Sequence, residues 1–217
     1  MNQINPDNIH SVGGSVRDDA MNIVPKDLDY LVVNQTEQDM LDAGYIKVGA
    51  DFPVFLHPIT GDEYALARIE RKDGEGYHGF YFITEGVTVK LDLGRRDFTM
   101  NAMSKQNNVI YDPFGGLEDI KNKIIRHVYD PADPEKEAFS EDPVRILRAA
   151  RFAARYSDFT IAPETIELMK KMVLNGEIDN LQPDRIWLEI EKTLKEKKPS
   201  IFFKVLDEIG ALDIILP

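Results

Sequence analysis

The sequence of 217 residues contains no cysteine, which excludes disulfide bonds, thiolate zinc sites and a thiol nucleophile. It has no apolar run near the roughly 18 residues that a membrane-spanning helix needs, and its polar first residues are not those of a signal peptide. It also has no internal repeat and no low-complexity segment. These absences predict a cytoplasmic protein without a membrane or disulfide partner, and they leave its oligomeric state open.

An excess of basic residues is also missing. The formal net charge is −12, with 26 Lys and Arg against 38 Asp and Glu, whereas general nucleic-acid binders carry a basic footprint. Arginines nevertheless concentrate at Arg95–Arg96 and between Arg145 and Arg155. This distribution permits a local RNA-binding groove, but it does not predict strong non-specific binding to RNA.

Hydrophobic periodicity predicts an α+β part followed by an all-helical part. The first part alternates expected strands at 9–12, 27–33, 52–57, 63–69 and 80–84 with expected helices at 16–21, 36–44 and 98–103. Residues 72–79, with three glycines, are expected to form a mobile loop, and 130–137 a linker. Helical spacing then covers 141–156, 163–174, 183–194 and 200–209. The predicted domains are 1–130 and 131–217.

Two carboxylates stand two residues apart at Asp27 and Asp29. Side chains of a strand alternate between its faces, so both carboxylates are expected to project from one face while Leu28 points into the core. Mg²⁺ takes one or two protein carboxylates and completes its octahedron with water and phosphate oxygens. The pair therefore predicts a metal site, although the same pattern is also common at a polar strand end.

A glycine-rich turn precedes that pair by about ten residues. Gly13, Gly14 and Ser15 stand between an expected strand and an expected helix, and Arg17 follows. Glycines let backbone N–H groups approach phosphate closely, and the start of a helix favours negative charge. A glycine turn alone is often structural, but a phosphate cradle next to paired carboxylates indicates a nucleotide site.

These residues, in order, resemble the signature of the polymerase-β-like nucleotidyltransferases. Further motifs are similar to those of class II tRNA nucleotidyltransferases (CCA-adding enzymes) and bacterial poly(A) polymerases: residues 95–102 (RRDFTMNA), 112–116 (DPFGG) and 141–148 (EDPVRILR). Several stretches look particularly like the gamma-proteobacterial CCA-adding type. The resemblance implies a polymerase-β-like head with a mixed five-stranded sheet and a helical neck.

The resemblance also implies roles for individual residues. Asp27 and Asp29 match the pair that binds two Mg²⁺ ions and carries catalysis, and Glu63 matches a third catalytic carboxylate, although it could equally be a solvated strand end. Asp97 is expected to cap the helix at 98–103. Residues implied in binding CTP and ATP are Gly13, Gly14, Ser15, Arg17, Arg96, Asp97, Asn101, Asp142, Arg145, Arg148 and Arg151.

Asp142 and Arg145 lie three residues apart, on neighbouring positions of one predicted helix face. A carboxylate only accepts hydrogen bonds and a guanidinium only donates them, so the pair suits the amino group and adjacent acceptor of cytosine and of adenine. Uracil and guanine present an N–H there, which leaves unpaired donors at about 1–3 kcal/mol each. The other interpretation is structural, because Asp142 before Pro143 is also a good helix start.

The predicted function is therefore template-independent addition of CMP and AMP to a tRNA 3′ end by two-metal phosphoryl transfer. Alternatives are a poly(A) polymerase, a partial C- or A-adding enzyme, and a non-catalytic RNA-binding remnant. The family's helical tail and phosphohydrolase domains do not follow residue 217, so weaker tRNA binding and no phosphohydrolase activity are expected. Trp187 and the methionines are expected in the core, and the four histidines show no metal-ligand spacing.

Overall fold

The computed structural model describes residues 4–48, 54–72, 80–133 and 138–216, and these form two compact units. The first unit comprises the residues up to 96 together with 100–116. The second comprises 97–99 and the residues from 117 onward. Within the described ranges, every helix is too short or too polar to cross a lipid bilayer.

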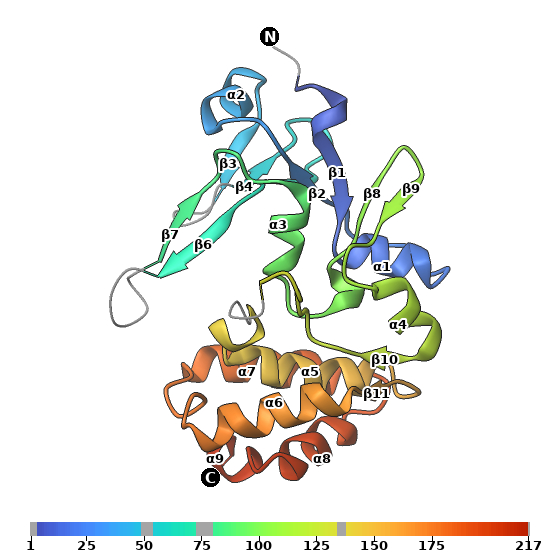
Figure 1. Ribbon diagram of the computed structural model, residues 1–217, viewed down its shortest axis with the longest axis vertical. Coiled ribbons are helices and arrows are strands. Elements are labelled where there is room, and N and C mark those ends of the chain that lie inside the picture. Colours follow the sequence, from blue (N-terminus) through green and yellow to red (C-terminus); the bar gives the residue numbers. More distant parts are fainter. Residues whose placement is uncertain (1–3, 49–53, 73–79, 134–137, 217) are drawn as a thin grey trace. The chain divides into compact units, whose positions relative to one another are not determined.

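A mixed sheet of seven strands organises the first unit (Figure 1), rather than the five strands expected. Its strand order is β3-β4-β5-β2-β1-β8-β9, and only β2 and β5 run parallel to each other. The bounds are β1 Ile9–Val12, β2 Asp29–Val32, β3 Ile46–Val48, β4 Val54–Leu56, β5 Glu63–Leu66, β8 Ser104–Gln106 and β9 Val109–Tyr111. A separate antiparallel ribbon pairs β6 Ile69–Lys72 with β7 Phe80–Ile83.

Three short helices accompany this sheet: α1 Gly14–Ala20, α2 Glu37–Asp42 and α3 Val89–Gly94. Thr36 starts α2 as predicted, since its hydroxyl accepts the N–H of Asp39 while the Asp39 carboxylate accepts the N–H of Thr36. Such reciprocal capping satisfies two backbone donors that the first turn leaves unpaired. A hydrophobic core in this unit is formed by Ile4, Val32, Met40, Phe55 and Leu66.

The second unit is a helical bundle, drawn from yellow-green to red in Figure 1. It contains α4 Gly116–Asn122 (whose first residue belongs to the other unit), α5 Val144–Arg155, α6 Pro163–Leu174, α7 Pro183–Leu194, α8 Ser200–Glu208 and α9 Leu212–Ile215, with a two-stranded parallel pair, β10 Ile124–Ile125 and β11 Thr160–Ile161. α5 packs against α7 and α8. Proline opens α6 and α7 as the sequence predicts, because its fixed backbone angle suits the first helical position.

The prediction of a helix at 98–103 is wrong. Only a 3₁₀ turn, Thr99–Asn101, forms there. The backbone on either side instead pairs across the second unit: the Thr99 N–H donates to the Arg126 carbonyl, and the Val128 N–H donates to the Asp97 carbonyl. The Phe98 ring is buried between Phe139 and Phe152, with centroids 5.9 and 5.3 Å away. Tertiary packing therefore overrides the local helical pattern.

Two predictions about buried residues are also wrong. Leu28 is 41% exposed and lies before β2, which begins at Asp29 rather than at 27. Trp187 is 62% exposed, because α7 buries the opposite face, which carries Glu189 and Thr193. The expectation of methionines in the core holds for Met40, Met100, Met103, Met169 and Met172, whereas Met21 is only partly buried. The predicted loop at 72–79 lies, beyond its first residue, outside the described residues.

Candidate nucleotide and catalytic site

The predicted glycine turn lies where β1 ends and α1 begins. Gly13 takes φ +68°, a left-handed conformation that glycine adopts without steric cost. The Ser15 hydroxyl donates to the Val12 carbonyl at 2.9 Å, so this buried side chain closes the turn from inside. A side chain at Gly13 would place its Cβ 2.7 Å from Nη1 of Arg96. The turn is therefore built for the close approach of that arginine.

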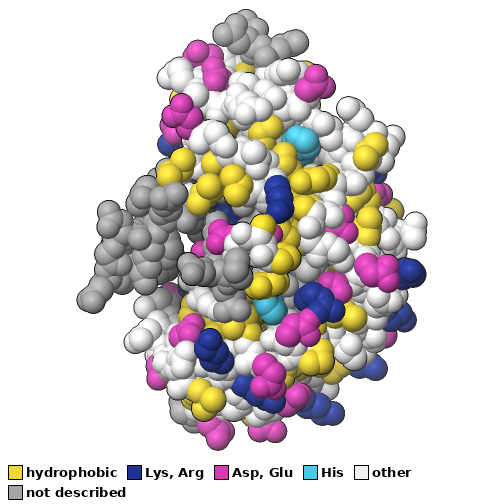
Figure 2. Space-filling view, in the orientation of Figure 1, with side chains coloured by type: hydrophobic (Ala, Val, Ile, Leu, Met, Phe, Trp, Pro, Cys, Tyr) yellow, Lys and Arg dark blue, Asp and Glu magenta, His cyan; other side chains and the backbone are white. Residues whose placement is uncertain are grey.

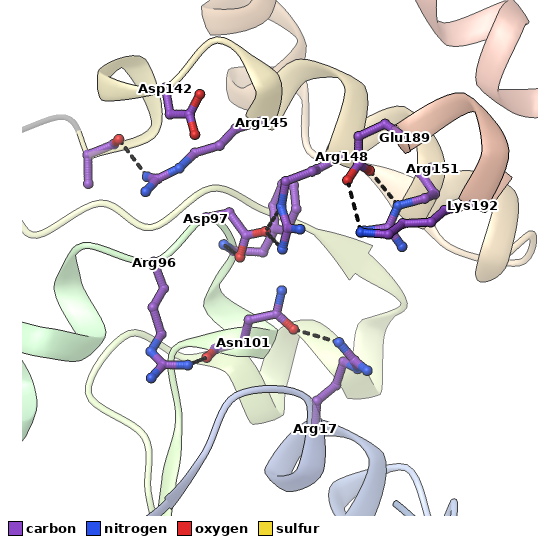
Figure 3. A network of polar contacts seen from close by, with 12 residues as sticks. Arg17, Arg96, Asp97, Asn101, Asp142, Arg145, Arg148, Arg151, Glu189 and Lys192 are labelled. Carbon is purple, nitrogen blue, oxygen red and sulfur yellow. Dashed lines mark hydrogen bonds and ion pairs between the residues drawn. The ribbon is translucent and has the colours of Figure 1, made fainter. Parts of the chain in front are cut away.

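The Arg17 guanidinium lies in the same unit and is only 5% exposed. Its Nε and Nη2 donate to Oδ1 of Asp18 at 2.9 and 2.7 Å, and its Nη1 donates to Oδ1 of Asn101 at 2.8 Å. Figure 3 shows Arg17 reaching up to Asn101. These bonds join the first helix to the segment after Arg96. Arg17 thus links α1 to Asn101, and its direct contact with phosphate stays a prediction.

Asp29 and Glu63 are register partners on the parallel strands β2 and β5, and Asp27 lies just before β2. All three side chains are accessible to solvent. Desolvation raises the pKa of Asp29, and the charges of Glu63 and Asp27 raise it further, whereas Arg96 lowers it. The structure thus brings together the three carboxylates that the sequence singled out. A bound cation would reduce the repulsion between their negative charges.

A divalent cation fits this donor set. Carboxylate oxygens are the protein ligands that Mg²⁺ prefers, and one or two suffice when phosphate and water complete the shell. In the part of the chain that the structure describes, no group of three or more acidic or histidine side chains is arranged to hold a metal ion by itself. Asp27 and Asp29 therefore remain the predicted ligands, with Glu63 as a neighbouring charge.

Asp92, on α3, organises the arginine pair. It is fully buried, and its Oδ1 accepts Nε and Nη2 of Arg95 at 3.0 and 2.8 Å while its Oδ2 accepts Nη2 of Arg96 at 3.3 Å. Burial alone would raise the pKa of Asp92, but Arg95 and Arg96 together hold it below its usual value. Nη1 of Arg96 also reaches the Asn101 carbonyl at 3.5 Å. Arg96 is therefore held between Asp92, Asn101 and the glycine turn.

Asp97 belongs to the second unit and does not cap a helix as predicted. Its Oδ1 accepts the N–H of Phe98 at 2.9 Å, and its Oδ2 accepts Nε and Nη2 of Arg148 at 2.8 and 2.6 Å. This carboxylate raises the pKa of Arg148 more than burial lowers it. Asp97 therefore ties α5 to the short segment 97–99, as the centre of Figure 3 shows.

The remaining predicted residues lie on α5 or just before it. Asp142 lies just before Pro143, the N-cap of α5, and its Oδ1 accepts the N–H of Val144 at 3.2 Å. Arg145 donates to the Ala138 carbonyl at 2.5 Å, and burial is the main cause that lowers its pKa. Arg151 is only 7% exposed and donates to Glu189 on α7 at 2.6 Å. Arg151 is thus a link between helices, and its predicted contact with nucleotide stays untested.

Comparison with known families matches residues 9–126 to the poly(A) polymerase head domain. This chain belongs to that family. A second match, at 158–217, is to the probable RNA- and SrmB-binding site of polymerase A. The resemblance to class II tRNA nucleotidyltransferases and poly(A) polymerases stated from the motifs is thereby confirmed.

Among curated relatives, a multifunctional CCA protein of Paraburkholderia phytofirmans is 52% identical over 97% of this chain and 52% of its own length. The chain therefore spans about half the length of the curated relatives it matches. A solved Bacillus stearothermophilus CCA-adding enzyme in complex with CTP is 30% identical, with a TM-score of 0.75 over 94% of this chain and 48% of that one. A CCA-adding enzyme complex with ATP gives the same identity and TM-score over 95% and 47%. The α+β head and helical neck are thus this family's fold.

Several residues that support the predicted site residues were not identified from the sequence. Asp92 lies three and four residues before Arg95 and Arg96, a helical spacing that could have indicated it. Glu189 and Arg185, the partners of Arg151 and Asp142, lie 38 and 43 residues further along the chain. No local pattern connects residues so far apart, so only the fold could identify them.

Replacing Gly13 with alanine should weaken nucleotide binding. The left-handed backbone costs an alanine about 1–2 kcal/mol, and the new Cβ would displace the Arg96 guanidinium. We expect CTP binding to weaken by about tenfold, the loss of roughly one charge-assisted hydrogen bond. Gly44→Ala is the matched control, because Gly44 has φ +89° and nothing within 4 Å of an added Cβ. Both variants should lose stability; equal CTP affinity in the two by isothermal titration would contradict the prediction.

Replacing Asp92 with asparagine should destabilise the fold by about 3 kcal/mol or more, because removing one partner of a buried ion pair leaves uncompensated charge. Asp19→Asn, which breaks the exposed pair with Lys105, should cost less than about 1 kcal/mol. Since the folded pKa of Asp92 is lowered, its contribution is present above the unfolded pKa and is lost as the pH falls through the folded pKa. Urea unfolding at pH 7 and at low pH measures both effects; equal losses for the two variants would refute the argument.

Proposed function

We propose that this chain adds CMP and AMP to the 3′ end of tRNA without a nucleic-acid template and releases pyrophosphate. The observation that carries the proposal is the joint placement of Asp29, Glu63 and Arg96 beside the glycine turn, in a chain of the poly(A) polymerase head domain family. Relatives named as CCA-adding enzymes, solved with CTP and with ATP, support the choice of substrates. A cytoplasmic location belongs to the same proposal.

Asp27 and Asp29 would hold Mg²⁺, with two ions expected from the family pattern. When bound, such ions lower the pKa of the attacking 3′-hydroxyl and neutralise charge on the triphosphate and leaving pyrophosphate. The chain's own residues bind and orient the nucleotide: Gly13, Gly14 and Ser15 shape the phosphate turn, and Arg96 adds positive charge beside it. Little covalent work is asked of the protein, because phosphoryl transfer depends mainly on position and charge.

The second unit would select the base. Asp142 supplies acceptors for the exocyclic amino group of cytosine or adenine, and Arg145 supplies donors for the adjacent ring nitrogen. Arg148, held by Asp97, would contact the nucleotide beside them. Functionally, residues 1–130 are proposed as the catalytic head and 131–217 as the base-reading neck.

RNA would bind at a local site rather than along an extended basic surface. On the face drawn in Figure 2, acidic and basic side chains are interspersed rather than gathered into a basic stripe. With a net charge of −12, binding to arbitrary RNA should be weak at physiological salt, since that binding depends on phosphate neutralisation. The tRNA 3′ end is the proposed partner because it is the primer that C and A addition requires.

The test uses tRNAs that end before CCA, after C and after CC, each incubated with Mg²⁺ and one labelled nucleotide at a time, followed by 3′-end sequencing. The proposal expects C on the first two primers and A on the third. Long A tails would indicate poly(A) polymerase, and addition of C alone or A alone a partial enzyme. No incorporation by folded protein on any primer would indicate an RNA-binding remnant and end the proposal.

A further inference from the structure

Asp142 has a long-range partner that its motif does not contain. Nη2 of Arg185, on α7, donates to Oδ2 of Asp142 at 2.7 Å, and the two side chains are 33% and 31% exposed. The other oxygen, Oδ1, accepts the N–H of Val144 at 3.2 Å. The carboxylate is thus held at both oxygens, by its own helix start and by a second helix. Each oxygen has two lone pairs, so the group can still accept a further donor.

Arg145 has a backbone partner of its own. Its Nη1 donates to the Ala138 carbonyl at 2.5 Å, as the left of Figure 3 shows. The negative charge of Asp142 raises the pKa of Arg145, so the two side chains attract each other. A loosely held Asp142 would therefore turn toward Arg145 and pair with it, which would occupy the acceptor and the donor proposed to read the base. The bond from Arg185 opposes this pairing of Asp142 with Arg145.

Arg185 lies on α7, a helix that a buried ion pair anchors to α5. One helical turn further along α7, Glu189 accepts Nε of Arg151 at 2.6 Å, with side-chain exposures of 5% and 9%. Lys192 adds a second cation at 3.7 Å from Glu189. Residues four apart share a helix face, so Arg185 and Glu189 both face α5, which packs against α7. The buried pair thereby sets where the Arg185 guanidinium is presented.

We propose that Arg185 is a positioning residue for base selection. It fixes the Asp142 carboxylate so that the remaining lone pairs accept the amino group of cytosine or adenine. The ligand class is a nucleoside triphosphate whose base presents an amino donor next to a ring acceptor. This inference rests on the base reading that the proposed function assigns to Asp142, and it adds a residue outside the recognised motifs.

The experiment compares Arg185→Gln, Arg185→Lys and a control, Lys195→Gln, which breaks an exposed pair with Glu191 on the same helix. Equilibrium binding of CTP, ATP, UTP and GTP is measured with each full-length variant, together with its thermal unfolding. We expect the CTP-to-UTP affinity ratio to fall about tenfold in Arg185→Gln, the scale of one misplaced hydrogen bond. In Arg185→Lys the ratio should fall less, because lysine keeps the positive charge but lacks the planar, bidentate donor group of arginine. The control should match the wild type.

A double-variant cycle separates positioning from a structural role. If Arg185 acts through Asp142, Arg185→Gln should change the CTP-to-UTP ratio by less than about twofold once Asp142→Ala is present, since coupled residues are not additive. An unchanged ratio in the single variant, an equal additional loss in the double variant, or an equal weakening of all four nucleotides with a lower unfolding midpoint would each overturn the proposal.

The two proposals fail in different ways. A wild-type protein that binds CTP and ATP over UTP but adds nothing to any tRNA primer would refute the proposed function and still leave the affinity ratio to decide on Arg185. A wild-type protein that adds C and A selectively, with the same selectivity in Arg185→Gln, would refute only the positioning role. Equal binding of all four nucleotides by the wild type would overturn base reading by Asp142 and, with it, the positioning role of Arg185.

Discussion

Asp29→Asn is expected to reduce nucleotide addition by at least about a thousandfold, or about 4 kcal/mol of transition-state stabilisation, because a metal-binding oxygen is lost. The same change should not weaken the fold. Desolvation, Glu63 and Asp27 raise the pKa of Asp29, so its ionised form is disfavoured in the folded chain. Stability from this group is present at low pH and is lost as the pH rises through its folded pKa. Removing the charge at pH 7 should therefore leave the free energy of unfolding equal or higher.

Single-turnover addition of labelled CMP measures the first effect, and urea unfolding in the presence of a chelator measures the second. Asp42→Asn serves as the control, because Asp42 is an exposed carboxylate of α2 that accepts a local bond from Gln38. It should add nucleotides at the wild-type rate. Activity retained in Asp29→Asn, or lost together with the fold, would contradict a catalytic role for this carboxylate.

Asp142→Ala is expected to relax base selection more than it slows addition. The preference for CTP over UTP should fall by roughly 10- to 100-fold, which corresponds to the cost of about 1–3 kcal/mol for an unpaired buried donor or acceptor. The substitution also removes the bond to the Val144 N–H, and the loss of one such hydrogen bond costs about 1 kcal/mol. Some loss of stability should therefore accompany the change without explaining the altered preference.

Competition between CTP and UTP on a tRNA that ends before CCA provides the readout, because the ratio of products is insensitive to the amount of active protein. Asp207→Ala, an exposed carboxylate on α8, is the control and should keep the wild-type ratio. Asp142→Asn offers a second variant of nearly unchanged shape that replaces one acceptor by a donor. The same CTP-to-UTP ratio in wild type and Asp142→Ala would refute base reading by this residue.

The sequence predicted the features that depend on local chemistry. The β1 strand, the capped start of α2, and the bounds of α6 and α7 follow from apolar spacing, Thr36 and two prolines. The side-by-side placement of Asp29 and Glu63 needed the parallel pairing of β2 with β5, which the family resemblance supplied rather than the spacing. Motif order therefore identified the carboxylates, while the sheet register shows that they are neighbours.

Two of the failures share one physical origin, which is packing between residues far apart in the chain. Phe98 is buried by rings at Phe139 and Phe152, and this burial replaces the predicted helix at 98–103. Trp187 is exposed because a buried ion pair, Arg151 with Glu189, occupies the inner face of α7. Hydrophobicity alone would not place a glutamate inside and a tryptophan outside.

The segment 97–99 belongs to the second unit, while the residues on both sides of it belong to the first. The backbone therefore passes into the helical unit and back within three residues, long before the chain enters that unit for good. No single cut can divide this protein into two intact halves. A truncated chain that ends near residue 130 would keep Phe98 but lose Phe139 and Phe152, and it would expose an aromatic ring that favours aggregation. Exchange of C-terminal halves between relatives would likewise have to preserve the fit of one N-terminal phenylalanine.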